Sequence, residues 1–318
     1  MKPPYKITDK IIRLVASISE RLGEINAIHL NKPPTKLRKK NRIKTIQSSL
    51  EIEGNTLTED QITAIIENKR IIAPEKDILE VLNAIKIYDQ LHTLNPNNIK
   101  DLEKAQGILM KGLIENEGKL RVKNVGIVQG SKIKHLAPDG SMVKGLMNDL
   151  FSYLKNDNEL ILIKSCVFHY EFEFIHPFID GNGRMGRLWQ TLILMQKYPV
   201  FEFIPVEHLI KINQEEYYKV LEQSDNSGES TLFIEWMLQI LLQALEELLK
   251  TQNRNLTVKD RIELFKVIIG KREFYRKEYL QNFREISTAT ASRDLKWAVE
   301  NEILKKSGEK RLTTYQFF

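Results

Sequence analysis

The segment HPFIDGNGRMGR, residues 176–187, decides the interpretation of this 318-residue chain. It interrupts a series of helical patterns with one histidine, one acid, three glycines and two arginines. Pro177 disfavours helix at the residue before it, so we expect a helix to end at His176 and to present it at the mouth of a loop. Gly181 and Gly183 let the loop turn freely and approach a ligand closely. Backbone N–H groups just before the next helix therefore predict an anion-binding cradle.

The charged residues of this segment favour a phosphate ligand. Arg184 and Arg187 lie three apart at the start of the new helix, where each cation is unfavourable by about 0.3–1 kcal/mol unless an anion lies nearby. Arginine binds phosphate bidentately. Asp180 would be repelled by bare phosphates, but it can hold a Mg²⁺ ion that bridges them. His176 can serve as a general base on an incoming hydroxyl. The alternative is a glycine-rich loop that joins two helices and carries solvated arginines. The combination of the histidine, the acid, the glycines and both arginines at fixed spacing favours a phosphate-binding site instead.

Composition indicates an ordinary globular protein, long enough for two domains, with 42% hydrophobic and 28% charged residues. The net charge of +6 permits an anionic partner without requiring one. One cysteine, Cys166, excludes an internal disulfide and indicates a reducing compartment. The longest apolar segment, residues 232–249, is interrupted by polar residues and predicts a core helix, not a membrane span. The N-terminus has no signal-peptide pattern. We therefore expect a cytoplasmic protein with no membrane partner.

The periodicity predicts a mainly α-helical fold with one irregular part and a separate C-terminal module. Between Gly118 and Gly145 the helical period is lost, and glycines alternate with short β-branched pieces, which predicts a β-hairpin flap. The polar run KTQNRNLT, residues 250–257, predicts a linker. Residues 257–318 then show three short helical patterns and a ribbon with a glycine turn, the layout of a winged helix-turn-helix domain.

Residues 176–187 resemble the signature of Fic-domain proteins, HPFx(D/E)GNGRxxR, at every specified position. The resemblance extends over roughly residues 35–250 and implies a Fic-type helical core. Family members with this form of the motif are typically AMP transferases, which move AMP from ATP onto a Ser, Thr or Tyr hydroxyl of a target protein. The resemblance thus implies a nucleotidyltransferase that uses ATP and Mg²⁺. The expected division is an N-terminal helical region (1–110), a catalytic core (111–250) and the winged helix (257–318).

The resemblance also assigns a role to each residue of the signature. It implies that His176 deprotonates the target hydroxyl and that Asp180 holds Mg²⁺. It implies that Gly181, Asn182 and Gly183 form an anion hole. It also implies that Arg184 and Arg187 bind the phosphates. Gly183 argues against the kinase branch of the family, in which lysine replaces the second glycine of GNG.

Two further segments carry candidate contacts. The flap piece GSKIKHL, residues 130–136, could pair in β-fashion with the peptide around the target hydroxyl, with Ile133 and Lys134 as docking residues. The alternative is a surface hairpin without a substrate role. Tyr217 and Tyr218 lie where the family packs residues around adenine, and they are candidate base contacts or core residues.

Residues 48–55, SSLEIEGN, suggest an off-switch. Ser49 and Glu53 are four apart and share a helical face, and Gly54–Asn55 ends the helix. The pattern resembles the inhibitory-helix motif of the family, (S/T)xxxE(G/N), and implies an inhibitory helix at about residues 45–55. Glu53 would pair with Arg187 and exclude the ATP γ-phosphate. A helix end with a solvated acid is the alternative.

The C-terminal module provides a competing function. From Thr257 onward there are 14 Lys and Arg residues against 9 Asp and Glu residues. If it binds DNA, the protein is a regulator with a nucleotide-sensing domain; otherwise the module recognises a target protein or packs. A gel shift that weakens with salt would separate these. The DNA contacts expected on residues 287–298 are Thr288, Thr290, Ser292, Arg293 and Lys296.

Two further possibilities stay open. The same site could remove AMP, with Glu53 positioning a water, and the chain could form a homodimer.

Overall fold

The computed structural model describes residues 2–27, 33, 35–129, 132–255, 257–283, 286–308 and 313–318, with the side chains of 36, 126–136 and 251–255 excepted. The chain forms two compact units, residues 1–244 and 245–318, and the boundary falls inside helix α11 (Thr231–Asn255). The fold is mainly helical, which confirms the expected class. Among the described helices, none combines the length and the apolar character needed to cross a membrane.

Five helices and one 3₁₀ turn make up the N-terminal part of unit 1. Helix α1 buries one residue per turn, from Ile11 to Ile25, as its amphipathic spacing predicts. Helix α3 begins at a capping box between Thr58 and Gln61, and Asn98 caps α5. The elements are α1 (Asp9–Ala27), α2 (Thr35–Ile52), α3 (Glu59–Ile66), α4 (Glu75–Asp89), η1 (Leu91–Thr93) and α5 (Ile99–Leu109).

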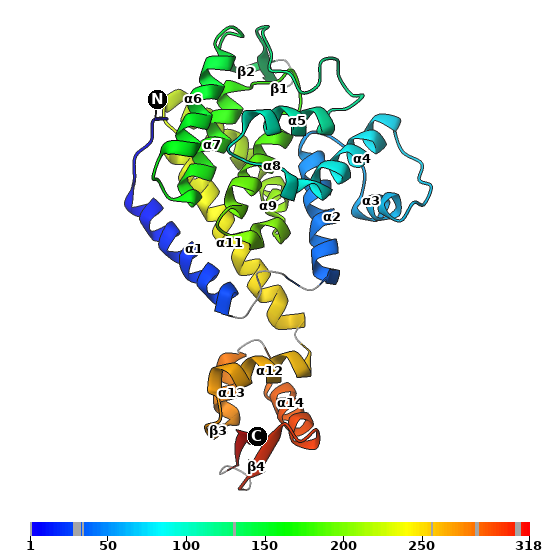
Figure 1. Cartoon of the computed structure of the whole chain (residues 1–318), viewed down its shortest axis with the longest axis vertical. Helices are drawn as coiled ribbons and strands as arrows, with labels where there is room; N and C mark the ends of the chain where they lie inside the picture. The colour runs from blue at the N-terminus through cyan, green and yellow to red at the C-terminus, as the bar shows by residue number, and fades with distance from the viewer. Residues whose placement is uncertain are drawn as a thin grey trace. The chain divides into compact units, whose positions relative to one another are not determined.

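Helices α7 (Ile161–Ile175) and α8 (Asn182–Met195) form the centre of unit 1 and pack against each other (Figure 1). Most residues of both helices are buried. Helix α7 is apolar on nearly every face, whereas α8 also buries polar residues, including both arginines of the segment 176–187. Helix α6 (Val143–Asn156) packs on α7, and an edge-to-face ring pair joins Phe151 to Phe168 with centroids 5.6 Å apart. The loop between α7 and α8 contains residues 176–181, and residues 182–187 form the start of α8.

The remaining elements of unit 1 surround this pair. Helix α9 lies against α2, and a two-stranded antiparallel hairpin pairs Gly126 with Leu136 and Gln129 with Lys132. Figure 1 shows this hairpin at the end of unit 1 that also carries α5 and α6. The elements are β1 (Gly126–Gln129), β2 (Lys132–Leu136), η2 (Pro199–Phe203), α9 (Val206–Ile212), α10 (Gln214–Ser227) and the first part of α11.

Unit 2 contains three further helices and a three-stranded antiparallel sheet of order β3–β5–β4. Its core is aromatic: the Phe265 ring lies edge-on to Phe274 and Tyr279, at 4.8 and 5.0 Å between centroids. The elements are α12 (Val258–Ile269), β3 (Phe274–Tyr275), α13 (Arg276–Asn282), α14 (Thr288–Glu300), β4 (Leu304–Ser307) and β5 (Thr314–Phe317).

The linker predicted over residues 250–257 was wrong for most of its length, because α11 continues to Asn255. The run contains neither proline nor glycine, so no residue in it stops a helix that is already formed. The polarity of this run is compatible with a helix as well as with a linker. Thr257 caps α12 in a capping box with Asp260.

Candidate active site

His176 lies directly after α7, which ends at Ile175 as the following proline requires. Its backbone adopts the left-handed conformation (φ 50°, ψ 61°), which is uncommon for a residue other than glycine. Its N–H group donates to the carbonyl of Phe172 at 3.0 Å, in the manner of a helix C-cap. The histidine therefore leaves the helix at a sharp turn and is partly exposed.

The loop after His176 is held by one asparagine and one phenylalanine. Asn182 Oδ1 accepts from the N–H of Phe178 at 2.9 Å, and Asn182 Nδ2 donates to the Phe178 carbonyl at 2.9 Å. The Phe178 ring is fully buried, with its centroid 6.2 Å from that of Phe172. The Asn182 side chain thus fixes the loop conformation, and its backbone begins α8.

A side chain on either of two glycines at the start of α8 would force a neighbouring side chain to move. Gly181 is the N-cap and has φ +83°, and a Cβ atom there would lie 2.7 Å from the sulfur of Met110. A Cβ atom on Gly183 would collide with Glu53 Oε1 and would lie 3.0 Å from Arg187 Nη1. The first turn of α8 is therefore open to close approach, and in this structure Glu53 is the group that approaches it.

Arg187 is buried, and among the described residues its hydrogen-bond acceptors belong to α2 and the turn that follows it. Its Nη2 donates to Glu53 Oε1 at 2.8 Å and to the Ser49 carbonyl at 2.9 Å, and its Nε donates to Ser49 Oγ at 3.2 Å. The arginine is 2% exposed. Burial alone would lower the pKa of the Arg187 guanidinium, but the charge and hydrogen bond of Glu53 together with the charges of Tyr217 and Glu173 outweigh it, so the pKa lies above its ordinary value.

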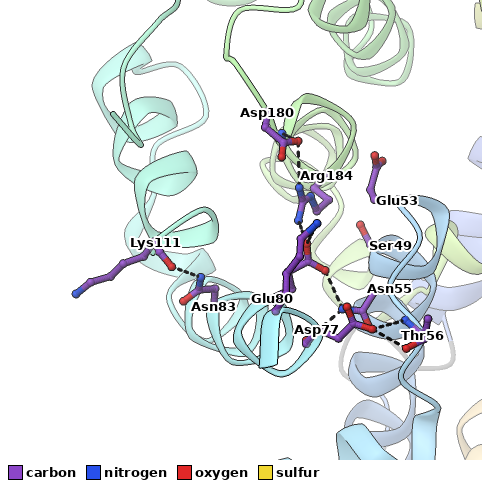
Figure 2. A network of polar contacts seen from close by, with 12 residues as sticks. Ser49, Glu53, Asn55, Thr56, Asp77, Glu80, Asn83, Lys111, Asp180 and Arg184 are labelled. Carbon is purple, nitrogen blue, oxygen red and sulfur yellow. Dashed lines mark hydrogen bonds and ion pairs between the residues drawn. The ribbon is translucent and has the colours of Figure 1, made fainter. Parts of the chain in front are cut away.

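Arg184 is also buried and lies between two carboxylates, as Figure 2 shows. Its Nη1 is 3.2 Å from Glu80 Oε1 on α4, and its Nη2 is 3.3 Å from Asp180 Oδ1. Glu80 in turn accepts from Asn55 Nδ2 at 2.8 Å, and Asn55 also donates to the Asp77 carbonyl at 3.1 Å. One buried carboxylate thus joins Arg184 to the turn that follows α2.

Sequence reasoning missed Glu80 and Asn55 as partners of the site. Glu80 is 6% exposed and comes from a helix 104 residues before Arg184. The only available signal was its charge on a helix whose neighbouring residues are apolar. Asn55 was assigned only to the helix end, although its side chain contributes to this network.

Asp180 is the acid best placed for a metal ion. Its side chain is 52% exposed, and Oδ1 receives the hydrogen bonds from Gly181 N and Arg184 that the described part of the chain supplies. No group of three metal-ligating side chains exists among the described residues. Mg²⁺ is commonly held by one or two carboxylates together with substrate phosphates. A single exposed carboxylate beside a helix N-terminus fits that pattern.

The other candidate residues lie as follows. Tyr217 is a core residue, 1% exposed, with its hydroxyl 3.0 Å from His169 Nε2. Tyr218 is partly exposed, and burial together with the charge of Glu53 raises the pKa of its phenol. The side chains of Ile133 and Lys134 lie outside the described residues, although the strand that carries them pairs with β1.

Comparison with known proteins agrees with the signature. Residues 95–194 match the Fic/DOC family. A crystal structure of a Fic family protein from Desulfovibrio desulfuricans G20 is 39% identical, covers 100% of this chain and 98% of that chain, and superimposes with a TM-score of 0.77. The chain belongs to the Fic family.

Two other relatives in the Fic family share less sequence identity with this chain. The protein adenylyltransferase Fic of Nematostella vectensis is 28% identical over 247 residues, which is 74% of this chain and 55% of that protein. The chain thus spans about half the length of this curated relative. Fic-1 (residues 134–508) of Caenorhabditis elegans has the same fold, with 19% identity and a TM-score of 0.61 over 77% of this chain and 74% of that one.

Proposed function

We propose that unit 1 transfers AMP from ATP to a Ser, Thr or Tyr hydroxyl of a target protein. The observation that most supports this is the combination, at one helix N-terminus, of a histidine at a loop mouth, an exposed acid and two buried arginines. Such a terminus binds phosphates through its N–H groups and dipole. The curated relatives of the Fic family that carry the name protein adenylyltransferase support the same reaction.

In this proposal His176 takes the proton of the target hydroxyl. The hydroxyl oxygen bonds to the α-phosphorus of ATP, the bond from that phosphorus to the bridging oxygen breaks, and pyrophosphate leaves with the electron pair. The N–H groups of residues 181–183 and the guanidinium groups of Arg184 and Arg187 bind the phosphates. Mg²⁺ bound to Asp180 and the phosphates would neutralise part of their charge.

We propose that Glu53 inhibits this reaction. Its carboxylate pairs with Arg187 and lies against Gly183, in the space that a phosphate would need. A hydrogen bond to a charged partner contributes about 1.5–3 kcal/mol, which corresponds to roughly tenfold or more in activity. This is weak enough for a partner or a conformational change to reverse it. Ser49 holds the same arginine and would keep it in place when Glu53 leaves.

For unit 2 we propose a winged helix module. The support is its three helices followed by the antiparallel strands β4 and β5, with β3 completing the sheet. Helix α14 would be the recognition helix. Its acid Asp294 is buried and paired with Arg261, so it does not reduce the positive charge of the exposed face. Recognition of a target protein is the role we favour, because the exposed acids Glu300 and Glu302 still offset part of that positive charge.

The test of AMP transfer uses mass spectrometry on lysate proteins incubated with ATP, Mg²⁺ and a Glu53→Gly variant. We expect AMP adducts that are more abundant than with the wild-type protein, because Arg187 is released for the nucleotide. Adding His176→Ala to the same variant should abolish them.

Glu51→Gly is the matched control. It makes the same substitution two residues earlier, at an acid that pairs with Lys211 at 3.4 Å. It should leave the adduct level at that of the wild-type protein. An adduct level that is the same with Glu53→Gly and wild type, or that survives loss of His176, would overturn the proposal.

A further inference from the structure

Arg121 is a buried arginine in the segment between α5 and β1, and it is 3% exposed. Within the described residues, every acceptor of its guanidinium group is a main-chain carbonyl. Its own N–H group donates to a fifth carbonyl. The bonds are Nε to His176 O at 2.7 Å, Nη1 to Lys123 O at 2.8 Å, Nη2 to Pro138 O at 2.7 Å and to Ile175 O at 3.0 Å, and N to Pro177 O at 2.8 Å.

Three of these carbonyls are consecutive and belong to Ile175 at the end of α7, to His176 and to Pro177. The C-terminus of a helix carries unpaired carbonyls and a partial negative charge, so a cation there is stabilising. Burial lowers the pKa of the Arg121 guanidinium, and the charge of Asp139 opposes this. An arginine fork reaches several carbonyls at once in a fixed geometry, which a lysine ammonium on a flexible stem does not.

The left-handed backbone of His176 needs such support. A residue other than glycine keeps this conformation only when its surroundings over-determine it. Arg121 binds the carbonyls on both sides of the His176 Cα atom, from Ile175 and from His176 itself. Together with the bond to Pro177, these contacts fix the turn from which the imidazole projects.

The other two carbonyls belong to the two ends of the flap. Lys123 lies just before β1, and Pro138 lies just after β2. The two ends also contact each other directly. Asn124 Oδ1 accepts from the N–H of Gly140 at 2.8 Å, and a Cβ atom on Gly140 would collide with the main chain of Val122. The flap ends and the His176 turn therefore share one guanidinium group.

We propose that Arg121 is a positioning residue that couples the flap to His176. When the flap binds a target, its two ends shift, and the hydrogen bonds of Arg121 transmit this shift to the backbone of His176. The inference rests on the proposed function, in which His176 is the base. It predicts that Arg121 affects the rate of transfer and leaves ATP binding intact, because Asn182 and Phe178 hold the phosphate cradle separately.

The test compares Arg121→Lys and Arg121→Met, each in the Glu53→Gly background. Lys123→Met is the matched control, because it removes a cation whose side chain is exposed two residues away. The first readout is hydrogen exchange by mass spectrometry over residues 173–180 and 137–142. The second is the rate of AMP labelling as a function of ATP concentration.

We expect faster exchange in both segments with both Arg121 variants and no change with Lys123→Met. We also expect kcat to fall by about tenfold or more, since small misplacements of a reacting group are costly. The KM for ATP should stay within about twofold, the pattern of a lost transition-state contact. Unchanged exchange over residues 173–180, or a KM that rises in step with the loss of kcat, would overturn the coupling.

Two outcomes separate this inference from its premises. If the Glu53→Gly parent labels nothing, AMP transfer fails as a proposal, and the exchange comparison still decides whether Arg121 links the two segments. If the Arg121 variants do not fold, Gly140→Ala disturbs the flap ends from the opposite side. It should then accelerate exchange over residues 173–180, and unchanged exchange there would reject the coupling.

Discussion

At the scale of single residues, Arg187 is the point at which two negative groups would compete. A buried guanidinium group needs compensation, and breaking a buried ion pair by removing one partner is destabilising. Glu53 provides this compensation in the structure, with its side chain 30% exposed. A bound triphosphate would provide it in the proposed reaction. The stability of unit 1 and its nucleotide affinity should therefore be linked through this one residue.

We accordingly predict that Glu53→Ala lowers the stability of the protein without ATP and enlarges the stabilisation by ATP and Mg²⁺. The loss should be about 1–3 kcal/mol, which lowers Tm by roughly 2–4 °C per kcal/mol in a domain of this size. Added nucleotide should then raise Tm more than in the wild-type protein, because it binds only the folded state. Thermal unfolding with and without nucleotide measures both effects.

Glu51→Ala is the control for that measurement, because the Glu51 carboxylate pairs with Lys211 and not with Arg187. It should respond to ATP like the wild-type protein. An equal ATP response in wild type and Glu53→Ala would contradict the competition for Arg187.

The residues that could be predicted from the sequence are those that lie together in it. The segment 176–187 is contiguous, so its spacing alone suggested one loop and one helix start. The partners brought in by folding gave no such signal. Glu80 and Arg121 are separated from the residues they hold by 104 and 55 positions, and each is one charged residue among many. Only the packing of α4 and of the flap ends reveals them.

At the scale of elements, the turn after α2 is tied to α4 through Asn55 (Figure 2). Asn55 Oδ1 accepts from Leu57 N at 3.0 Å, and its Nδ2 binds both Glu80 and the Asp77 carbonyl. Asn55 is 5% exposed, so these bonds are shielded from water. This connection fixes the end of the helix that carries Ser49 and the turn that carries Glu53.

We predict that Asn55→Ala raises AMP labelling above that of the wild-type protein, but less than Glu53→Gly does. The loss of these bonds loosens the turn and lets Glu53 leave Arg187 more often, while the carboxylate itself remains. The same labelling assay measures it.

Thr56→Ala is the control for this change, because it removes an exposed bond between the same turn and α4 and leaves the buried bonds of Asn55 in place. Labelling by Asn55→Ala at or below the wild-type level would show that the turn does not govern the position of Glu53.

Element boundaries were predictable where a residue forces them, as at Pro177, and not where polarity was the only guide. The helix α11 shows this, because its polar C-terminal part stays helical. Polar residues occur in helices and in linkers alike, whereas a proline disfavours helix at the residue before it. The hairpin β1–β2 followed from glycine spacing, although its register and bulge depend on pairing that the sequence does not specify.

At the scale of the whole molecule, each unit has its own core, and unit 2 also contains a buried ion pair. Arg261 and Asp294 join α12 to α14 through two bonds, from Nε at 2.6 Å and from Nη2 at 2.9 Å. The Tyr279 hydroxyl donates to the same carboxylate at 3.1 Å. Asp294 is 1% exposed, so loss of its charge would remove a buried counter-charge from the Arg261 guanidinium group.

We predict that Asp294→Asn destabilises unit 2 by about 3–5 kcal/mol and leaves AMP labelling in the Glu53→Gly background unchanged. Chemical unfolding followed by circular dichroism should show an earlier transition for unit 2. Lys296→Gln, on the same helix, breaks only an exposed pair with Glu300 and should have no effect. A parallel loss of labelling would show that the two units do not fold independently.

The Glu53–Arg187 pair lies within one chain, and this determines how activity would depend on protein concentration. An inhibitory group tethered to its own site acts at an effective concentration set by the fold and not by the amount of protein. Dilution cannot release it, and overexpression cannot strengthen it. Specific activity should therefore be constant over a wide range of enzyme concentration. A specific activity that changes on dilution would instead identify a second copy of the chain as part of the control.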